Sequence, residues 1–249
     1  MNNVKVLGII PARGGSTSIK YKNIANVGSK PLIYYAIREA KKSKLLDAFI
    51  VCTDSPKIAK VAKKYGADVP YLRPKNTAKK FSVEIEYQQH ALKWLEKNRG
   101  WKPDLVVLIK PTAPLRSAEL IDKVVQVAQK NPQYSMVRTV SAPPSHPYRM
   151  WQFEKDDMTL SQILPAFVSA PDFQKWGHDV PRQKLARVYV HNAAVDAIWA
   201  KHIRRGVGAV FGGPIGGVIT DSRVSVDIDE PLDLEIVDKL LRASRQDDH

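Results

Sequence analysis

Apolar and polar positions follow two recurring patterns along the first 141 residues. Short runs rich in Val, Ile and Leu predict buried strands, and longer stretches with apolar residues three and four positions apart predict helices. The predicted strands are 4–12, 48–54, 67–74, 104–111 and 135–141. The predicted helices are 31–44, 55–66, 83–98 and 117–131. This alternation favours an α/β fold with a Rossmann-like, mostly parallel sheet and helices on both of its faces.

The pattern breaks after residue 141. Residues 142–186 are rich in proline and lack a clear period, which indicates an inserted segment that packs on the rest of the chain or on a second subunit. Regular patterns return over 187–199 and 216–229, and a last helix is expected from Leu232 to about Ala243. No repeat or low-complexity linker is found, so we expect residues 1–249 to form a single domain with one insertion.

Cysteine content and the length of apolar runs exclude several classes of protein. The single cysteine, Cys52, excludes an internal disulfide framework and any multi-cysteine metal site. Cys52 lies in an apolar strand pattern, so we expect a core residue and not a nucleophile. No apolar run approaches the ~20 residues that a membrane-spanning helix needs. The chain passes from Met-Asn-Asn directly into a strand pattern with no signal peptide, and we expect a soluble cytoplasmic protein with no membrane partner.

Charge is unevenly distributed. The formal net charge is +14, residues 1–38 carry six Lys or Arg and no acid, and residues 221–249 carry nine acids and four bases. The two ends could face each other across a site for a polyanion and a divalent metal, or the bases could form a solvated surface. We expect no nucleic-acid partner, because the sequence contains no recognised nucleic-acid-binding motif.

The loop after the first strand, IPARGGSTSIKYKN (10–23), concentrates groups that bind phosphate. The pair Gly14-Gly15 lets the backbone approach a phosphate, with N–H groups free to point at it. Full charges come from Arg13, Lys20 and Lys22, and hydroxyl donors come from Ser16 and Ser18. The loop matches neither the GxGxxG nor the P-loop pattern. The alternative is a basic surface loop with a glycine turn.

Near the other end of the chain, Asp227 and Asp229 are two positions apart at the end of a predicted strand. Alternate strand residues share a face, so both carboxylates are expected to point the same way. Two hard oxygen ligands that leave room for water and phosphate suit Mg²⁺. The alternative is that Asp229 or Glu230 caps the helix that follows at Pro231.

The segment ARGGSTSIKYKN (12–23) resembles a motif of the CMP-sugar-acid synthetases, an acylneuraminate cytidylyltransferase-like family. Further segments resemble the family in order: CTD (52–54), YGADVPYLRP (65–74), LIKPTAPLRSAELID (108–122), PRQ (181–183), HNAAV (191–195) and VSVDIDEPLDL (224–234). The resemblance covers nearly the whole chain. It implies an α/β nucleotidyltransferase that forms a homodimer through the inserted region.

The resemblance also implies a reaction and a set of site residues. CMP would pass from CTP to the anomeric hydroxyl of a small acidic sugar, a sialic-acid-like 2-keto sugar acid, with release of pyrophosphate. Arg13, Lys22 and Asp229 would be catalytic, and Asp227 and Asp229 would hold Mg²⁺ as the cofactor. The implied nucleotide-binding residues are Ala12, Arg13, Gly14, Gly15, Ser16, Lys22, Asn23 and Arg73, and Lys110, which departs from the family pattern, is a further candidate. The implied acceptor-binding residues are Arg182, Gln183 and Asn192.

The chain departs from the family pattern at several of these places. The departures are Thr17 for a lysine, Lys80-Phe81 for Asp-Thr, Lys110 for a glutamine, Ala193 for a glycine and Asp196 for a tyrosine. They leave open a different sugar or sugar phosphate as acceptor, or a nucleotide-binding homologue with weakened catalysis. Lys110 either replaces the cation missing at Thr17 and reaches a phosphate or the acidic acceptor, or it extends into solvent.

Overall fold

The computed structural model describes residues 4–16, 18–79, 81–153, 160–162, 179–206 and 212–246. Contacts between these residues divide the chain into two compact units. One unit combines Met1–Val140 with His191–His249, and the other is Ser141–Val190. The second unit contains the predicted insertion at 142–186. The part this segment plays in dimerisation stays a prediction.

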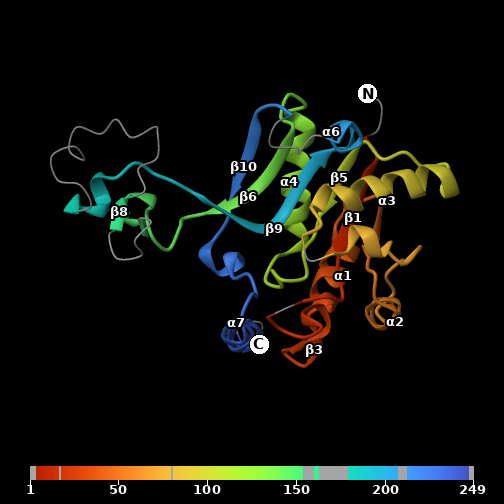
Figure 1. The fold of residues 1–249 in the computed structure, drawn as a ribbon, viewed down its shortest axis with the longest axis horizontal. Coiled ribbons are helices and arrows are strands. Elements are labelled where there is room, and N and C mark those ends of the chain that lie inside the picture. The colour runs from red at the N-terminus through yellow and green to blue at the C-terminus, as the bar shows by residue number, and fades with distance from the viewer. Residues whose placement is uncertain are drawn as a thin grey trace. The chain divides into compact units, whose positions relative to one another are not determined.

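The larger unit is built on a six-stranded sheet in the order β10-β6-β9-β5-β1-β4 (Figure 1). Its strands are β1 (Val6–Pro11), β4 (Ala48–Cys52), β5 (Leu105–Leu108), β6 (Met136–Ser141), β9 (Val190–Trp199) and β10 (Ile215–Ile219). β1 pairs in parallel with β4 and β5, and β10 pairs in parallel with β6. β9 runs antiparallel to β5. The predicted α/β fold with a mostly parallel sheet is therefore confirmed.

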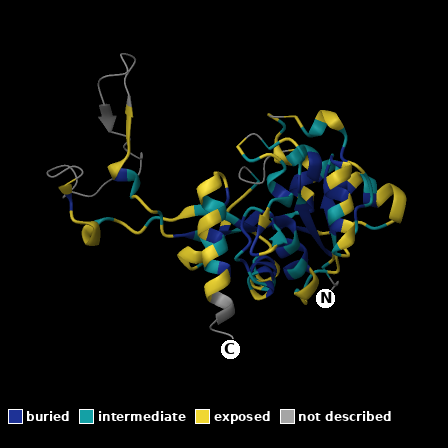
Figure 2. Cartoon of the chain, turned by 90° about the horizontal axis from the view of Figure 1, so that it is seen from below, coloured by how far each residue is buried: buried dark blue, intermediate teal, exposed yellow. Residues whose placement is uncertain are grey.

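Helices cover both faces of this sheet. They are α1 (Leu32–Lys42), α2 (Pro56–Lys64), α3 (Glu84–Arg99), α4 (Ala118–Lys130) and α6 (Ala200–Arg205). Side chains of α1, α2 and α4 share one core cluster, and side chains of α3 and α6 share another. The alternation of β1 explains the division, because Val6 and Ile10 belong to the first cluster, whereas Leu7 and Ile9 belong to the second. Figure 2 shows these strands as the buried centre of the unit.

A third small core joins the carboxyl-terminal helix to the amino-terminal part of the chain. The helix α7 (Pro231–Gln246) packs on the hairpin of β2 (Asn26–Val27) and β3 (Lys30–Pro31). Asp238 Oδ1 accepts a 2.7 Å hydrogen bond from the backbone N–H of Gly28. Gly28 has a φ of 56°, and a Cβ there would lie 2.7 Å from the Tyr35 hydroxyl, so the turn requires glycine.

Two predicted elements differ in the structure. Residues 67–74 make only single parallel bridges, Ile50 to Asp68 and Thr53 to Leu72, because Pro70 interrupts the run with a residue that has no N–H to donate. The predicted strand there is wrong. In the segment 216–229, the strand ends at Ile219 and the chain continues through a 3₁₀ turn, so Asp227 and Asp229 do not lie on a strand.

Short 3₁₀ helices connect several elements. They are η1 (Lys22–Ile24), η2 (Lys75–Thr77), η3 (Pro147–Arg149), η5 (Arg182–Lys184) and η7 (Ser222–Ser225). None of the helices in the described part of the chain has the length and apolar character needed to pass through a bilayer.

The smaller unit has an antiparallel pair of its own. The strands β7 (Trp151–Phe153) and β8 (Leu160–Gln162) pair with each other. Tyr148 and Val180 are buried together, and Leu185 packs against them.

Candidate functional site

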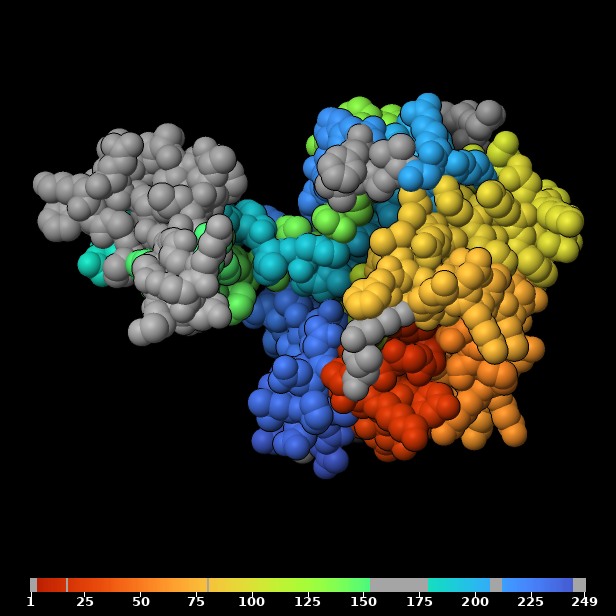
Figure 3. Space-filling view, viewed as in Figure 1, coloured from red at the N-terminus to blue at the C-terminus, as the bar shows by residue number. Residues whose placement is uncertain are grey.

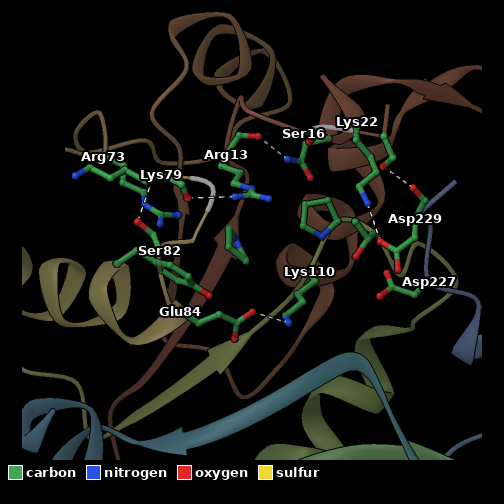
Figure 4. Close-up of a pocket in the computed structure, with 16 residues that line it drawn as sticks. Arg13, Ser16, Lys22, Arg73, Lys79, Ser82, Glu84, Lys110, Asp227 and Asp229 are labelled. Atoms are coloured by element: carbon green, nitrogen blue, oxygen red, sulfur yellow. Dashed lines mark hydrogen bonds and ion pairs between the residues drawn. The ribbon is translucent and has the colours of Figure 1, made fainter. Parts of the chain in front are cut away.

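A cavity of about 480 Å³ opens beyond the carboxyl ends of β1 and β5, where an open parallel sheet binds its ligands. Its lining includes five cationic and three acidic side chains: Arg13, Lys22, Arg73, Lys79, Lys110, Glu84, Asp227 and Asp229 (Figure 4). In Figure 3 the amino-terminal segment (red), the region just before residue 100 (orange to yellow) and the carboxyl-terminal segment (blue) lie together on one face of the larger unit. Residues distant in sequence therefore share one polar cavity.

The two ends of the chain meet directly in this cavity. Lys22 Nζ lies 2.9 Å from Asp229 Oδ1 and donates a 2.6 Å hydrogen bond to the carbonyl of Ile228. The Ser18 hydroxyl donates a 2.6 Å bond to the carbonyl of Asp229. The Lys22 side chain is 13% exposed and that of Asp229 is 74% exposed, so the carboxylate is the partner open to solvent. The predicted meeting of the basic loop with the acidic segment is confirmed at this contact.

The pair Gly14-Gly15 was expected to present free N–H groups to a phosphate, and the structure differs at Gly14. The N–H of Gly14 donates a 2.8 Å bond to Asp54 Oδ1, so it is not free for a phosphate in this structure. A Cβ at Gly14 would lie 3.0 Å from the Cβ of Ser55, which gives close packing as a reason for glycine. Ala12 is buried and bonds to the carbonyl of Cys52. Neither Ala12 nor the two glycines line the cavity.

Other predicted nucleotide-binding residues do line the cavity: Arg13, Ser16, Lys22, Asn23, Arg73 and Lys110. Asn23 holds the loop by donating a 3.0 Å bond to the carbonyl of Arg13. Arg73 is buried, donates through Nε to Thr77 Oγ1 at 3.2 Å and stacks 4.6 Å from the centre of the Tyr87 ring. Thr17, which stands where the family pattern has a lysine, lies outside the described residues.

The carboxylates at 227 and 229 reach the cavity through a buried residue between them. Ile228 is fully buried, and its N–H donates a 2.9 Å bond to the carbonyl of Thr112 in the loop after β5. This anchor leaves both flanking aspartates on the cavity wall. The start of α7 is held by Asp233 Oδ2, which accepts from the N–H groups of Asp229 and Glu230 at 2.8 and 2.7 Å. These bonds come from the side chain of Asp233, and no cap from the side chain of Asp229 or Glu230 is found among the described residues.

The chemistry of this pair fits Mg²⁺. Asp227 Oδ1 is buried and has no hydrogen-bond partner among the described residues, so one oxygen is available to a cation. Among the described residues no group of three or more His, Cys, Asp or Glu side chains could hold a metal. Two carboxylates without nitrogen or sulfur ligands suit a hard cation that keeps waters and phosphate oxygens in its shell.

A buried guanidinium behind the cavity was not singled out from the sequence. Arg116 is 2% exposed, donates through Nε to the carbonyl of Ala194 at 2.8 Å and through Nη2 to the carbonyl of Lys110. Burial lowers the pKa of Arg116 to about 9, and the charges of Asp227 and Glu39 partly offset this effect. Arg116 therefore stays cationic at neutral pH and fixes the backbone of the loop after β5.

Of the predicted acceptor-binding residues, Asn192 belongs to the larger unit and is not among the residues that line its cavity. Asn192 is buried, and its amide oxygen accepts from Thr139 Oγ1 at 2.6 Å while its amide nitrogen donates to Thr220 Oγ1 at 2.7 Å. A contact between Asn192 and an acceptor stays a prediction, and it would compete with these bonds. Arg182 and Gln183 are exposed in the smaller unit, and their contact with an acceptor also stays a prediction.

Two of the departures from the family pattern have a structural account. Asp196 is 3% exposed and lies 3.0 Å from His191 Nε2 and 3.3 Å from Arg138 Nη2. Burial alone would raise the pKa of Asp196, but the hydrogen bond from His191 and the charge of Arg138 outweigh it and lower the pKa. Ala193 has a φ of 55°, a left-handed conformation that glycine adopts with less strain. Phe81 is exposed, and position 80 lies outside the described residues.

Sequence reasoning missed six side chains of the cavity wall: Lys79, Ser82, Glu84, Tyr87, Pro111 and Thr112. The proline-threonine pair after β5 was the one available signal, because it follows a buried strand at its carboxyl end. The expectation for Cys52 is confirmed, since Cys52 is buried in β4 and burial raises the pKa of its thiol.

Comparison with known proteins agrees with this geometry. A family model described as Cytidylyltransferase matches residues 7–145. The chain is 30% identical over 238 residues to post-translational flagellin modification protein B of Campylobacter coli, covering 96% of this chain and 95% of that protein. It is 29% identical over 245 residues to CMP-N,N'-diacetyllegionaminic acid synthase of Legionella pneumophila, covering 98% of this chain and 99% of that protein.

A solved structure shares the fold. The structure of CMP:2-keto-3-deoxy-manno-octonic acid synthetase with CTP superposes with a TM-score of 0.69 at 15% identity, covering 96% of this chain and 99% of that one. The match of the family model over more than half of the chain, together with a 30% identical relative of nearly the same length, settles the family. This chain belongs to the cytidylyltransferase family and is a nucleotidyltransferase.

Proposed function

We propose that this chain transfers CMP from CTP to the anomeric hydroxyl of a 2-keto sugar acid and releases pyrophosphate. The observation that carries the proposal is the single cavity in which Lys22 of the glycine loop meets Asp229 of the carboxyl-terminal segment at 2.9 Å. Such a site places cations for a triphosphate beside carboxylates for a divalent metal. Family membership and the named Legionella pneumophila relative support a sugar acid as the acceptor.

The side chains of the cavity have different roles in phosphoryl transfer. Arg13 and Lys22 hold the triphosphate, and Ser16 adds a hydroxyl donor. Charge in the transition state spreads over the phosphoryl oxygens, so fixed cations and correct positioning contribute most of the rate. The acceptor oxygen bonds to the α-phosphorus, the bond to the leaving pyrophosphate oxygen breaks, and the hydroxyl proton passes to water.

Asp227 and Asp229 are the residues that would hold Mg²⁺. The unpartnered Oδ1 of Asp227 and the exposed carboxylate of Asp229 support this assignment. When bound, Mg²⁺ supplies a divalent charge beside the phosphate oxygens. Asn23 and Arg73 keep the loop and the opposite wall in place, and we assign the nucleotide to the space between them.

We also propose that the active protein is a cytoplasmic homodimer joined through the inserted segment. The smaller unit contains this segment. Its large apolar side chains Met150, Tyr189 and Val190 are each more than 40% exposed. Burial of these side chains against a second copy would remove apolar surface from water.

The experiment is a pyrophosphate-release assay on the full chain with Mg²⁺ and CTP. The acceptors are N,N'-diacetyllegionaminic acid, N-acetylneuraminic acid and a sugar 1-phosphate, and ATP, GTP and UTP replace CTP in parallel reactions. We expect release with CTP and at least one 2-keto sugar acid, and a CMP-sugar product in the same reaction. No release with CTP and any 2-keto sugar acid would remove the proposal. Release only with the sugar 1-phosphate would assign a different acceptor class.

A further inference from the structure

An ion pair closes one side of the cavity between two elements that are distant in sequence. Lys110 follows β5, and Glu84 is the first residue of α3. Lys110 Nζ lies 2.6 Å from Glu84 Oε1, and both side chains line the cavity (Figure 4).

The two partners differ in how freely they can move. The Lys110 side chain is 22% exposed, and its backbone carbonyl is held by the buried guanidinium of Arg116. The Glu84 side chain is 50% exposed and lies in the first turn of α3, where unpaired N–H groups and the helix dipole favour a negative charge with or without a cation nearby. Glu84 can therefore turn into water at small cost, whereas Lys110 stays directed at the cavity.

The position of Lys110 indicates which substrate it meets. Its loop is bonded to the metal-binding segment through the 2.9 Å contact from the N–H of Ile228 to the carbonyl of Thr112. The cations assigned to the triphosphate, Arg13 and Lys22, come from the loop after β1. In-line displacement at the α-phosphorus requires the acceptor hydroxyl to approach from the side opposite the leaving pyrophosphate. Figure 4 shows Arg13 and Lys22 on one side of the cavity and Lys110 with Glu84 on the other, and we therefore assign the side at Lys110 to the acceptor.

We propose that Lys110 binds the carboxylate of the acceptor sugar acid and that Glu84 is the resident counter-ion which this carboxylate displaces. The inference rests on the proposed function. It assigns Lys110 and Glu84 as specificity-determining residues, because an acceptor without an anionic group cannot exchange for Glu84. The exchange replaces one charge-assisted contact of Lys110 by another, so no buried charge is left without a partner.

The test uses variants of the full chain and measures KM for the acceptor at saturating CTP, and KM for CTP at saturating acceptor. Lys110→Gln should raise the acceptor KM by at least about tenfold, because a hydrogen bond to a charged group is lost. Glu84→Gln should lower the acceptor KM by about two- to fivefold, the range expected when a solvent-exposed competing ion pair is removed. In the Lys110→Gln background, Glu84→Gln should have no further effect.

A matched control is the exposed pair Lys102–Glu96, 3.7 Å apart and outside the cavity lining, and Glu96→Gln should leave both KM values unchanged. A rise in acceptor KM on Glu84→Gln, or a rise in KM for CTP alone on Lys110→Gln, overturns the inference. If Lys110→Gln does not fold, the sign of the Glu84→Gln effect decides.

The wild-type reaction distinguishes failure of this inference from failure of the proposed function. Wild-type turnover of a 2-keto sugar acid with acceptor KM values unchanged in every variant removes the inference and keeps the proposed function. No wild-type turnover with any 2-keto sugar acid removes the proposed function and this inference with it.

Discussion

The ion pairs of this chain differ in which partner is buried and which is exposed to solvent. The Lys22–Asp229 pair joins a nearly buried ammonium to a carboxylate that is mostly in solvent. The His191–Asp196–Arg138 group has the opposite arrangement, with a buried carboxylate between a partly exposed imidazole and a partly exposed guanidinium. Exposed pairs contribute little to stability, whereas a buried carboxylate depends on its partners. Substitution of Asp229 should therefore alter activity, and substitution of Asp196 should alter stability.

Asp229→Asn should lower kcat/KM by at least about 100-fold, the scale of removing one electrostatic group from a reacting phosphate. Its free energy of unfolding should change by less than about 1 kcal/mol, because the carboxylate is mostly exposed. Pyrophosphate release and urea unfolding measure the two effects. Asp221→Asn is the matched control, since Asp221 pairs with Arg223 at 3.2 Å outside the cavity lining. Comparable activity of the two variants would contradict the assignment of Asp229.

Asp196→Asn should lower the free energy of unfolding at pH 7 by about 1–3 kcal/mol, because charged hydrogen bonds to His191 and Arg138 are lost from a buried site. The pKa of Asp196 is lower in the folded chain than in the unfolded chain. Its contribution is therefore present above an unfolded pKa of about 3.9 and disappears as pH falls through the folded value.

Urea unfolding of both proteins between pH 7 and pH 3 measures this effect. The difference between wild type and Asp196→Asn should stay constant down to about pH 4 and then shrink. A difference that grows as the pH falls would contradict the lowered pKa.

Among the helices and strands, the central ones follow from sequence pattern. The runs at 4–12, 48–54 and 104–111 are buried on both sides of the sheet, and a continuous apolar run is what such strands require. The strand predicted at 67–74 was wrong because composition does not show that the segment turns away after a single bridge on either side of Pro70.

The cavity was predictable only in part. The loop at 10–23 and the aspartates at 227 and 229 carry residue types that imply phosphate and metal. The pairing of Lys110 with Glu84 depends on where α3 begins relative to the end of β5, and no local pattern specifies that distance. The location of Asp227 and Asp229 at the cavity was right, although the predicted strand was replaced by a loop anchored at Ile228.

The start of α7 links helix capping to the site. Asp233 accepts the N–H groups of Asp229 and Glu230, so Asp233→Ala should cost about 1 kcal/mol of stability and loosen the segment that carries Asp229. We expect kcat to fall several-fold in this variant, with little change in KM for CTP. Asp233→Asn keeps a capping oxygen and should retain most of the activity. Equal losses in the two variants would show that the charge, and not the cap, matters.

For the whole molecule, the net charge of +14 should favour the approach of an anionic nucleotide. Raising NaCl from about 0.05 M to about 0.3 M should increase KM for CTP several-fold and change kcat little, because the screening length falls from about 14 Å to about 6 Å. Steady-state kinetics at fixed Mg²⁺ measures both constants.

The control for this effect is a double variant of α2, Lys60→Glu with Lys63→Glu, on an exposed helix face outside the cavity lining. Each change removes one positive and adds one negative charge, so the net charge falls from +14 by four to +10. The salt dependence of KM should become weaker, while the unfolding midpoint stays close to that of the wild type. An unchanged dependence would assign the salt effect to the cavity alone.

The contact between Lys22 and Asp229 also has a consequence during translation. The two residues are separated by most of the polypeptide, and the aspartate emerges from the ribosome long after the lysine. A nascent chain can complete the sheet strands that precede β10 while its cavity still lacks both carboxylates. If Asp227 and Asp229 hold the metal as proposed, a chain that stops before them should fold in part and yet be inert.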